Sequence, residues 1–341
     1  MEILPFGLGG SGCRSRTYTV SALADRNHDN IGRVAVLGAG TMAPGIAAVF
    51  AGAGFESCIY ARREGAAVAA RRRSKDQRQL LVEHDLATHA DTPINATDDL
   101  DEALRGAGLV IEAITENAQS KASLFGQVED LVADDVILAS TTSGLDIDQI
   151  SVGARSRGRF VVMHFWNPAH LVPLVEVMGG ADTESWLLDL VESVLRRIGK
   201  YPVRLIRYAP GFIGARLQQA VVREAIALLQ AGVASAEDID AATRHSFGAR
   251  FPVLGPLETS DVGGLDVIAA IHSYLLADLD SSTQPQDLLT EKVAGGDLGV
   301  KTGRGFYDWS ERDPTELAQR RDEELIMRLK SLHRSGELSF G

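Results

Sequence analysis

The chain has 341 residues, and its 34 lysines and arginines against 46 aspartates and glutamates give a formal net charge of −12. That length predicts about two domains. A content of 45% hydrophobic and 23% charged residues is typical of a soluble globular protein and excludes wholesale disorder. The acidic balance disfavours a nucleic-acid partner, and no apolar run approaches the roughly 18 residues of a membrane-spanning helix. We therefore expect a cytoplasmic protein without a nucleic-acid or membrane partner.

Two features of the sequence predict no chemistry. The two cysteines, Cys13 and Cys58, are too few for a disulfide framework and lack the arrangement of zinc ligands, so we expect no metal site. Residues 1–30 combine several glycines with polar residues and show no hydrophobic periodicity. This composition predicts a flexible N-terminal extension.

From Ile31 onwards, short apolar runs alternate with segments of helical length, which is the pattern of parallel strands joined by helices. This pattern predicts an α/β fold with a Rossmann-type doubly wound sheet over residues 31–208. The expected strands are Arg33–Leu37, Ser57–Tyr60, Leu109–Ile114, Val136–Ser140 and Phe160–His164, and the expected helices include Gly45–Ala53, Ala66–Glu83 and Lys121–Val132.

After Tyr208 the apolar spacing changes to three or four residues, which indicates helices. Ser235 followed by Asp238 is typical of a capped helix start, and another helix is expected over Leu265–Leu279. Residues 209–341 should therefore form an all-helical C-terminal domain for substrate binding and dimerisation. Its apolar faces exceed what one nucleotide-binding domain could cover, which favours a homodimer.

A glycine-rich segment, Gly38-Ala39-Gly40-Thr41-Met42-Ala43-Pro44-Gly45, follows the first predicted strand and opens a helix. The first glycine permits a tight turn, the second lets backbone amides approach a pyrophosphate, and the small third residue lets helix and strand pack closely. The strand before and the helix after favour a dinucleotide site over a glycine-rich turn that only packs. The predicted cofactor-binding residues here are Gly38, Gly40, Thr41, Met42 and Ala43.

The end of the second predicted strand bears on the choice of cofactor. An acid that holds the ribose hydroxyls of NAD is expected there, but the sequence is Ile59-Tyr60-Ala61-Arg62-Arg63, with no carboxylate before Glu64. Arginine can grip the extra phosphate of NADP through two hydrogen bonds. We therefore favour NADP(H) over NAD(H), bound by Arg62 and Arg63. The basic run Arg71–Arg73 is either a solvated helix face or a contact for a phosphorylated substrate.

A histidine and a glutamate form the candidate acid–base pair. The segment His164-Phe165-Trp166-Asn167-Pro168 ends a predicted strand, where sheets of this class bind their ligands. Glu176 lies twelve residues later on an apolar, strand-like run, which we expect to fold back beside it. A carboxylate next to imidazole fixes the tautomer and raises the basicity of the ring, as the removal of an alcohol proton requires. A buried structural ion pair is the alternative interpretation of the pair alone.

With these motifs in order, the sequence resembles the L-3-hydroxyacyl-CoA dehydrogenase family from Ile31 to Trp309. Two segments, Gly255–Thr259 and Gly264–Asp266, are similar to the branch containing lambda-crystallin (gulonate dehydrogenase) and enzymes of small hydroxylated acids. The family stretches are Gly38–Ala47, Thr115–Asn117 with Lys121, Ala139–Leu145, His164–Val177, Pro210–Ala225 and Lys301–Tyr307.

The resemblance implies a role for each site residue. His164 would take the hydroxyl proton while hydride passes to the nicotinamide, Glu176 would orient His164, and Ser143 would hydrogen-bond the reacting oxygen. The resemblance also implies an acyl-CoA substrate, a place in fatty acid metabolism and a homodimer. The family positions near the cofactor are Glu116, Lys121, Asn167 and Lys301, and Ser143 and Asn167 would also contact the substrate.

Two departures from the family pattern leave alternatives open. Ala215 occupies the position of a family asparagine near the substrate, and only Gln218 or Gln219, one turn further on, offers a replacement donor. The segment before Leu109 is also shorter than in the acyl-CoA enzymes and shows no clear counterpart of their coenzyme A contacts. A free small hydroxy acid, a carrier-bound hydroxyacyl group and a catalytically idle crystallin-like protein therefore remain alternatives to an acyl-CoA thioester.

Overall fold

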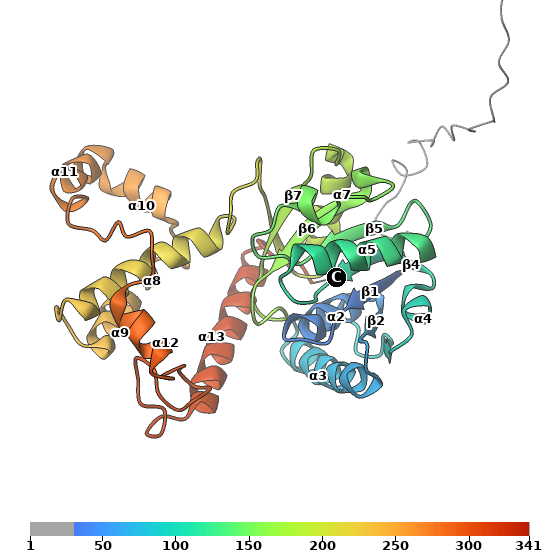
Figure 1. The fold of residues 1–341 in the computed structure, drawn as a ribbon, viewed down its shortest axis with the longest axis horizontal. Helices are drawn as coiled ribbons and strands as arrows, with labels where there is room; N and C mark the ends of the chain where they lie inside the picture. The colour runs from blue at the N-terminus through green and yellow to red at the C-terminus, as the bar shows by residue number, and fades with distance from the viewer. Residues whose placement is uncertain (1–30, 341) are drawn as a thin grey trace, which may run out of the picture.

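Eight strands form one sheet in the order β3-β2-β1-β4-β5-β6-β7-β8 (Figure 1). The computed structural model describes residues 31–340, so the predicted extension at residues 1–30, with Cys13, lies outside the described residues. The strands are β1 (Arg33–Leu37), β2 (Glu56–Tyr60), β3 (Ile94–Thr97), β4 (Ala107–Glu112), β5 (Ile137–Ser140), β6 (Phe160–Phe165), β7 (Leu174–Gly179) and β8 (Tyr201–Arg204).

The strands from β1 to β6 run parallel, and their connections carry helices on both faces of the sheet. The chain moves from β1 outwards through β2 to β3 and then returns to β4 on the other side of β1. In a sheet of this kind the crevice beyond the carboxyl ends of the strands at that reversal is where ligands bind. The helices of this half are α2 (Met42–Gly52), α3 (Glu64–Glu83), α4 (Leu100–Leu104), α5 (Ala118–Leu131), α6 (Ile147–Ile150) and α7 (Ser185–Arg197).

The predicted Rossmann-type sheet with a following helical domain is confirmed, and all five predicted strands are present with ends that differ by at most two residues. The two edge strands, β3 and β8, were not predicted. Only Ile94 and Thr97 of β3 are buried, and β8 contains Pro202, which a strand tolerates at a sheet edge. Both strands are short, and neither has the continuous apolar run that marks a strand buried on both faces.

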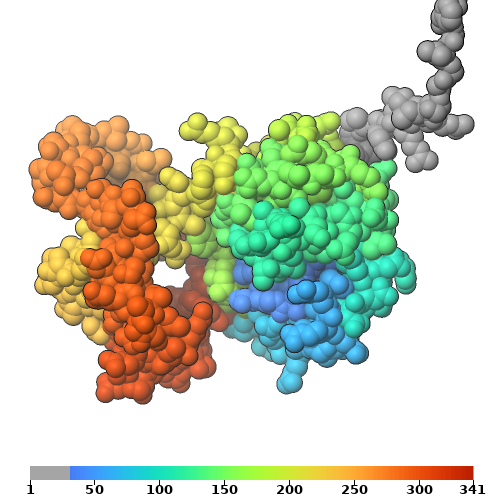
Figure 2. Space-filling model, in the orientation of Figure 1, coloured from blue at the N-terminus to red at the C-terminus, as the bar shows by residue number. Residues whose placement is uncertain are grey.

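From Gly214 onwards the described chain is helical, and its first helices extend away from the sheet (Figures 1 and 2). Ser235 caps α9 by accepting a hydrogen bond from the amide of Asp238, as its sequence predicts. None of the described helices is long and apolar enough to cross a membrane. The helices are α8 (Gly214–Gln230), α9 (Ala236–His245), α10 (Pro256–Gly263), α11 (Leu265–Leu275), α12 (Asp287–Ala294) and α13 (Pro314–Arg334).

The last helix, α13, returns to the first domain (Figure 1). Its buried residues, Ile326, Leu329 and Leu332, share one hydrophobic cluster with residues of α2 and α7. Leu338 joins the same cluster beyond the helix. The C-terminal segment therefore belongs by sequence to the helical half and by packing to the core of the sheet domain.

Candidate active site

A cleft of about 1240 Å³ opens beyond the carboxyl ends of the parallel strands. The loops after β1, β2, β4 and β5, the end of β6 and the first turns of α8 line it. The predicted site residues that line it are Gly38, Gly40, Thr41, Met42, Arg62, Arg63, Glu116, Ser143, His164, Asn167 and Gln218. The crevice expected at the reversal of strand order is thus present, and it collects most of the predicted residues.

The glycine turn has the geometry of a dinucleotide cradle. Gly38 has a φ of 136°, and a Cβ there would overlap the carbonyl group of Ala113, the residue after β4. A Cβ on Gly40, in contrast, would meet nothing within 4 Å, although Gly40 lines the cleft. Gly38 is therefore required by the fold, whereas Gly40 leaves open the backbone surface that a pyrophosphate would approach. The turn fits a dinucleotide.

The third position of the motif and an arginine of α3 support this turn. Ala43 is fully buried under the cleft rather than lining it, in keeping with close packing of helix and strand. The guanidinium of Arg73 donates to the carbonyl oxygens of Ala39 at 2.8 Å and Gly40 at 3.4 Å. One member of the basic run Arg71–Arg73 thus holds the dinucleotide turn, a contact that neither sequence interpretation of the run foresaw.

His164 and Glu176 meet across β6 and β7. These strands are antiparallel, and their register pairs the two residues directly. Nδ1 of His164 lies 2.8 Å from Oε2 of Glu176, while the ring lines the cleft and is only 7% exposed. Nε2 forms no hydrogen bond with the described part of the chain. A carboxylate on Nδ1 favours the tautomer in which Nδ1 carries the proton and Nε2 is an acceptor.

Glu176 is held by four donors. The indole Nε1 of Trp166 donates to Oε2 at 3.2 Å, and the amides of Ile213 and Gly214, at the start of α8, donate to Oε1 at 2.8 and 3.0 Å. Burial by itself would raise the pKa of Glu176, but the hydrogen bonds from His164 and these donors outweigh it and lower that pKa below its usual value. Glu176 is therefore a carboxylate near neutral pH.

A second acidic centre forms at the loop after β4. Oε1 of Glu116 accepts hydrogen bonds from the hydroxyl of Thr142 at 2.6 Å and from the amide and hydroxyl of Ser143 at 2.8 and 3.1 Å. Burial would raise the pKa of Glu116, but these bonds and the nearby ammonium of Lys121 lower it. Lys121 is itself buried and bridges Glu112, at 2.7 Å, and Glu116, at 3.3 Å.

The structure does not bring every predicted residue to the cleft. Lys121 lies beneath it, in its ion pairs with the two glutamates, and does not line it. Lys301 is exposed on the helical domain and is not among the lining residues. Of the two candidate replacement donors, Gln218 lines the cleft together with Ala215, whereas Gln219 does not. Among residues 31–340 there is no cluster of side chains that could hold a metal ion.

Sequence reasoning missed three contributors: Trp166, Thr142 and Arg73. Trp166 stands within the motif around His164, and Thr142 lies in the family stretch Ala139–Leu145, but neither was predicted to have a role. The signal for Trp166 is its spacing, since a residue two positions after His164 on an extended chain projects to the same face. Arg73 gave no local signal, because its contact spans 34 residues.

Comparison with known proteins identifies the family. The NAD binding domain of 3-hydroxyacyl-CoA dehydrogenase matches residues 33–208, and the C-terminal domain of the same enzyme matches residues 211–309. The chain belongs to the 3-hydroxyacyl-CoA dehydrogenase family. As a member it is an enzyme, an oxidoreductase with the family's NAD-binding domain. Helix α13 lies beyond both matched segments.

Relatives within this family act on different substrates. The chain is 32% identical over 298 residues to 5-formyl-3-hydroxy-2-methylpyridine 4-carboxylate 5-dehydrogenase of Mesorhizobium japonicum, covering 87% of this chain and 96% of that protein. It is 33% identical to the 3-hydroxybutyryl-CoA dehydrogenase of Clostridioides difficile, covering 82% of this chain and 99% of that one. A crystal structure of the pyridine-carboxylate enzyme, described as an NAD+ dependent dismutase, superposes with a TM-score of 0.84 at 31% identity, covering 89% of this chain and 99% of that chain.

Proposed function

We propose that this enzyme interconverts the 3-hydroxyl group of a 3-hydroxyacyl-CoA thioester and the corresponding ketone, with His164 as general base in oxidation and general acid in reduction. The hydrogen bond between His164 and Glu176 at the cleft carries this proposal. The two residues match the family motif, and the imidazole lines the same cleft as the dinucleotide turn at Gly38 and Gly40.

The acid–base chemistry follows from the electrostatics of the pair. In oxidation the hydroxyl proton moves to Nε2 of His164, and the imidazolium that forms faces the Glu176 carboxylate at 2.8 Å. Trp166 and the amides at the start of α8 keep Glu176 in place during this change. A dinucleotide held at the turn of Gly38 and Gly40 would supply the acceptor for the hydride that leaves the hydroxyl-bearing carbon. Ser143 lines the cleft and its hydroxyl donates to Oε1 of Glu116 at 3.1 Å. Its proposed role, from the family motif, is to hydrogen-bond the reacting oxygen of the substrate.

The test is the consumption of reduced nicotinamide with acetoacetyl-CoA by the purified enzyme. We expect rapid turnover, and His164→Asn should reduce kcat by roughly 10²–10⁴, the usual contribution of a positioned acid or base. His245→Asn, at an exposed position in the last turn of α9, is the matched control and should leave kcat unchanged. Equal activity of the two variants would overturn the role of His164.

A second candidate substrate is a free hydroxylated or carbonyl acid without coenzyme A. The superposition on the pyridine-carboxylate enzyme, with a TM-score of 0.84, favours it, because two 3-hydroxybutyryl-CoA dehydrogenase structures reach 0.66 and 0.67. The short segment before Leu109 points the same way. Turnover of small hydroxy acids, with none of acetoacetyl-CoA or of a pantetheine thioester, would select this candidate.

For the cofactor, we propose NADP(H) over NAD(H). Two exposed arginines, Arg62 and Arg63, line the cleft directly after β2, and no carboxylate lies between the end of β2 and Glu64. The expected result is a higher kcat/KM with NADPH than with NADH, and a loss of that preference in an Arg62→Ala, Arg63→Ala double variant. A preference for NADH in the parent enzyme would remove the proposal without affecting the role of His164.

We further propose a homodimer formed through the helical domain. Helices α9 to α12 contain no buried residue within the single chain, and they expose large apolar side chains such as Leu257 at 81% and Val262 at 76%. Exposed apolar surface of this kind marks an interaction site. Light scattering should give about twice the 36.5 kDa chain mass, and a monomer at micromolar concentration would contradict the proposal.

A further inference from the structure

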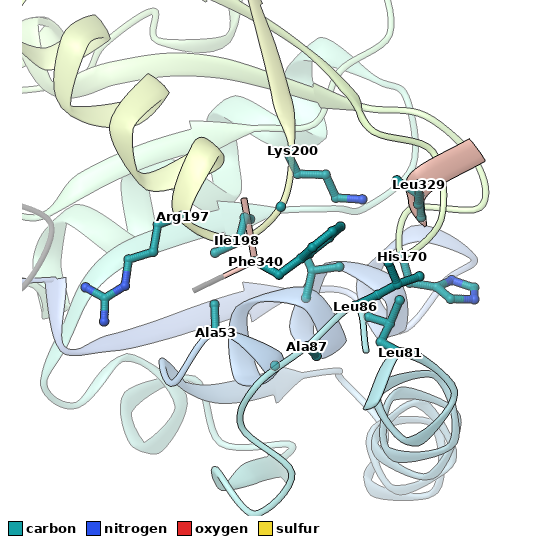
Figure 3. Close-up of a pocket in the computed structure, with 13 residues that line it drawn as sticks. Ala53, Leu81, Leu86, Ala87, His170, Arg197, Ile198, Lys200, Leu329 and Phe340 are labelled. Atoms are coloured by element: carbon teal, nitrogen blue, oxygen red, sulfur yellow. The ribbon is translucent and has the colours of Figure 1, made fainter. Parts of the chain in front are cut away.

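Lys200 is a buried amine that the proposed chemistry does not use. It follows α7, is 2% exposed, and its Nζ donates to the carbonyl oxygens of Ala169 at 2.7 Å and Val172 at 2.9 Å. It lines a small cavity between the sheet domain and the C-terminal segment, in which Figure 3 shows its amine extended toward Leu329 of α13. Within the described residues no carboxylate forms an ion pair with it.

The absence of an ion-pair partner makes this lysine costly. Burying an amine without a counter-charge is unfavourable, and burial lowers the pKa of Lys200 to about 7. His170, in the same cavity, has its pKa lowered to about 4, mainly by burial, so its ring is neutral near pH 7 and adds no second charge. An aliphatic side chain would fill the space without this cost. What Lys200 provides and an aliphatic residue could not is the pair of hydrogen bonds to the carbonyls of Ala169 and Val172.

Both carbonyls belong to the turn that joins β6 to β7. The amides of Leu171 and Val172 donate to the carbonyl of Pro168, which closes the turn on itself. The other side of the turn rests on α2, where a Cβ on Gly45 would come within 3.0 Å of Ala169. The turn is thus held between Lys200 and the helix that opens at the dinucleotide site.

The start of the same connection lines the active-site cleft. Trp166 and Asn167 immediately precede the turn, both line the cleft, and Trp166 donates to Glu176. A displacement of the turn would reach these residues directly, because only Asn167 and Pro168 separate Trp166 from Ala169. The position of the Lys200 amine is therefore connected to the carboxylate that faces His164.

The C-terminal segment covers Lys200. Leu329 of α13 and Phe340 line the cavity, and a Cβ on Gly199 would overlap the Phe340 ring. Figure 3 shows Phe340 next to Ile198, whereas Arg197 points away from the other labelled residues. The cavity has a volume of about 10 Å³, at or below the room that one water molecule needs. The cavity therefore offers at most the room of a single water molecule beside Lys200.

We propose that Lys200 is a positioning residue, which clamps the turn at residues 168–172 and thereby holds Trp166 and Asn167 in the active-site cleft. The clamp acts through the turn and contacts neither substrate nor cofactor. Its effect on turnover rests on the proposed role of His164, whereas its effect on the location of Trp166 does not. The two can therefore be tested separately.

The first experiment reports on Trp166 without turnover. The chain has three tryptophans, so Trp186→Phe and Trp309→Phe leave Trp166 as the single emitter. In this background Lys200→Met, which keeps the length and removes the donor, should shift the emission of Trp166 and increase its quenching by iodide. Leu329→Ala is the matched control, because it loosens the same cavity without touching the carbonyl contacts, and it should lower the melting temperature but leave Trp166 emission unchanged.

The second experiment measures the effect on the reaction. Lys200→Met should lower kcat by at least about tenfold, since small displacements of positioning groups have effects of this size or larger. In the oxidation direction, where His164 must be unprotonated, the acid limb of the pH–rate profile should also move to higher pH, because a Glu176 that loses the Trp166 donor stabilises the imidazolium of His164 more strongly. If Lys200→Met lowers only the melting temperature, as Leu329→Ala does, and leaves Trp166 emission and the pH profile unchanged, the proposal is overturned. An inactive parent enzyme would sink the proposed function, and Trp166 emission would still decide the clamp.

Discussion

Nδ1 of His164 and Oε2 of Glu176 lie 2.8 Å apart because antiparallel pairing places the two residues opposite each other on β6 and β7. Side chains opposite each other in an antiparallel pair project to the same face. The strand that carries the histidine to the cleft therefore meets its carboxylate partner without any loop contribution. A reversal of strand direction at one place in a parallel sheet creates the candidate acid–base site.

Glu176→Gln tests whether the negative charge of Glu176, rather than its size, supports the reaction. The amide is similar in size and can still accept from His164, but it cannot stabilise an imidazolium. We expect kcat to fall by roughly 10²–10⁴, the usual contribution of a positioned acid or base. In the oxidation direction, where His164 is the base, the acid limb of the pH–rate profile should move to lower pH. Steady-state kinetics across pH checks both. Retention of full kcat would show that Glu176 only fills space.

The same carboxylate should make stability depend on acid pH. Because its hydrogen bonds lower the pKa of Glu176 in the folded state, the unfolded state binds more protons as the pH falls. The contribution of Glu176 to the free energy of unfolding is therefore complete above about pH 4.3, the ordinary value, and is lost as the pH falls through the lower folded-state pKa. Urea unfolding between neutral and acid pH should show a shallower loss of stability in Glu176→Gln than in the parent.

Two glycines of the dinucleotide turn should respond differently to alanine. At Gly40 the added methyl meets no protein atom within 4 Å but projects at the cleft, so Gly40→Ala should leave the melting temperature unchanged and weaken cofactor binding at least about tenfold. At Gly38 the methyl would overlap the Ala113 carbonyl at a φ of 136°, so Gly38→Ala should destabilise the fold itself. Thermal melts and cofactor titration distinguish the two. Unchanged cofactor affinity in Gly40→Ala would mean that the ligand does not pass over this turn.

Arg73 should matter for the cofactor where its neighbour Arg72 does not. Its guanidinium holds the carbonyls of Ala39 and Gly40, and it adds a positive charge beside the turn that would receive a pyrophosphate. Arg73→Met should raise the KM for the cofactor about three- to tenfold with little change in kcat, in line with the loss of a charged hydrogen bond at an exposed site. Arg72→Met, on the same helix and exposed, is the control. Equal KM values in the two variants would indicate that the bond to the turn contributes nothing.

The central strands could be predicted from the sequence because they are buried on both faces. Burial on both faces selects runs of mainly apolar residues. The edge strands could not, since Ile94–Thr97 is half polar and Tyr201–Arg204 contains a proline. The glycine turn was also predictable, because its residues are adjacent in sequence. The features that could not be predicted depend on contacts between segments that are distant in sequence, such as the hydrogen bond from Arg73 to Ala39.

The same distinction holds within the candidate site. His164 and Glu176 could be named from their motif, but their register depends on a reversal of strand direction that no local pattern encodes. Residues 209–341 were expected to be helical, but no local pattern indicates that Leu329 of α13 would cover Lys200. Sequence reasoning also left two glutamines equivalent, and the structure separates them.

That separation makes Gln218 a testable donor. Gln218 lines the cleft beside Ala215, whereas Gln219 does not, so only Gln218→Ala should affect the reaction. Loss of a donor aimed at developing charge costs on the order of 10² in kcat, and we expect a decrease of about 10- to 100-fold for Gln218→Ala and none for Gln219→Ala. The family asparagine, restored as Ala215→Asn in the Gln218→Ala background, should recover part of that loss because it places an amide at the same wall of the cleft. Equal kcat values in Gln218→Ala and Gln219→Ala would show that the chain has no replacement for the family asparagine.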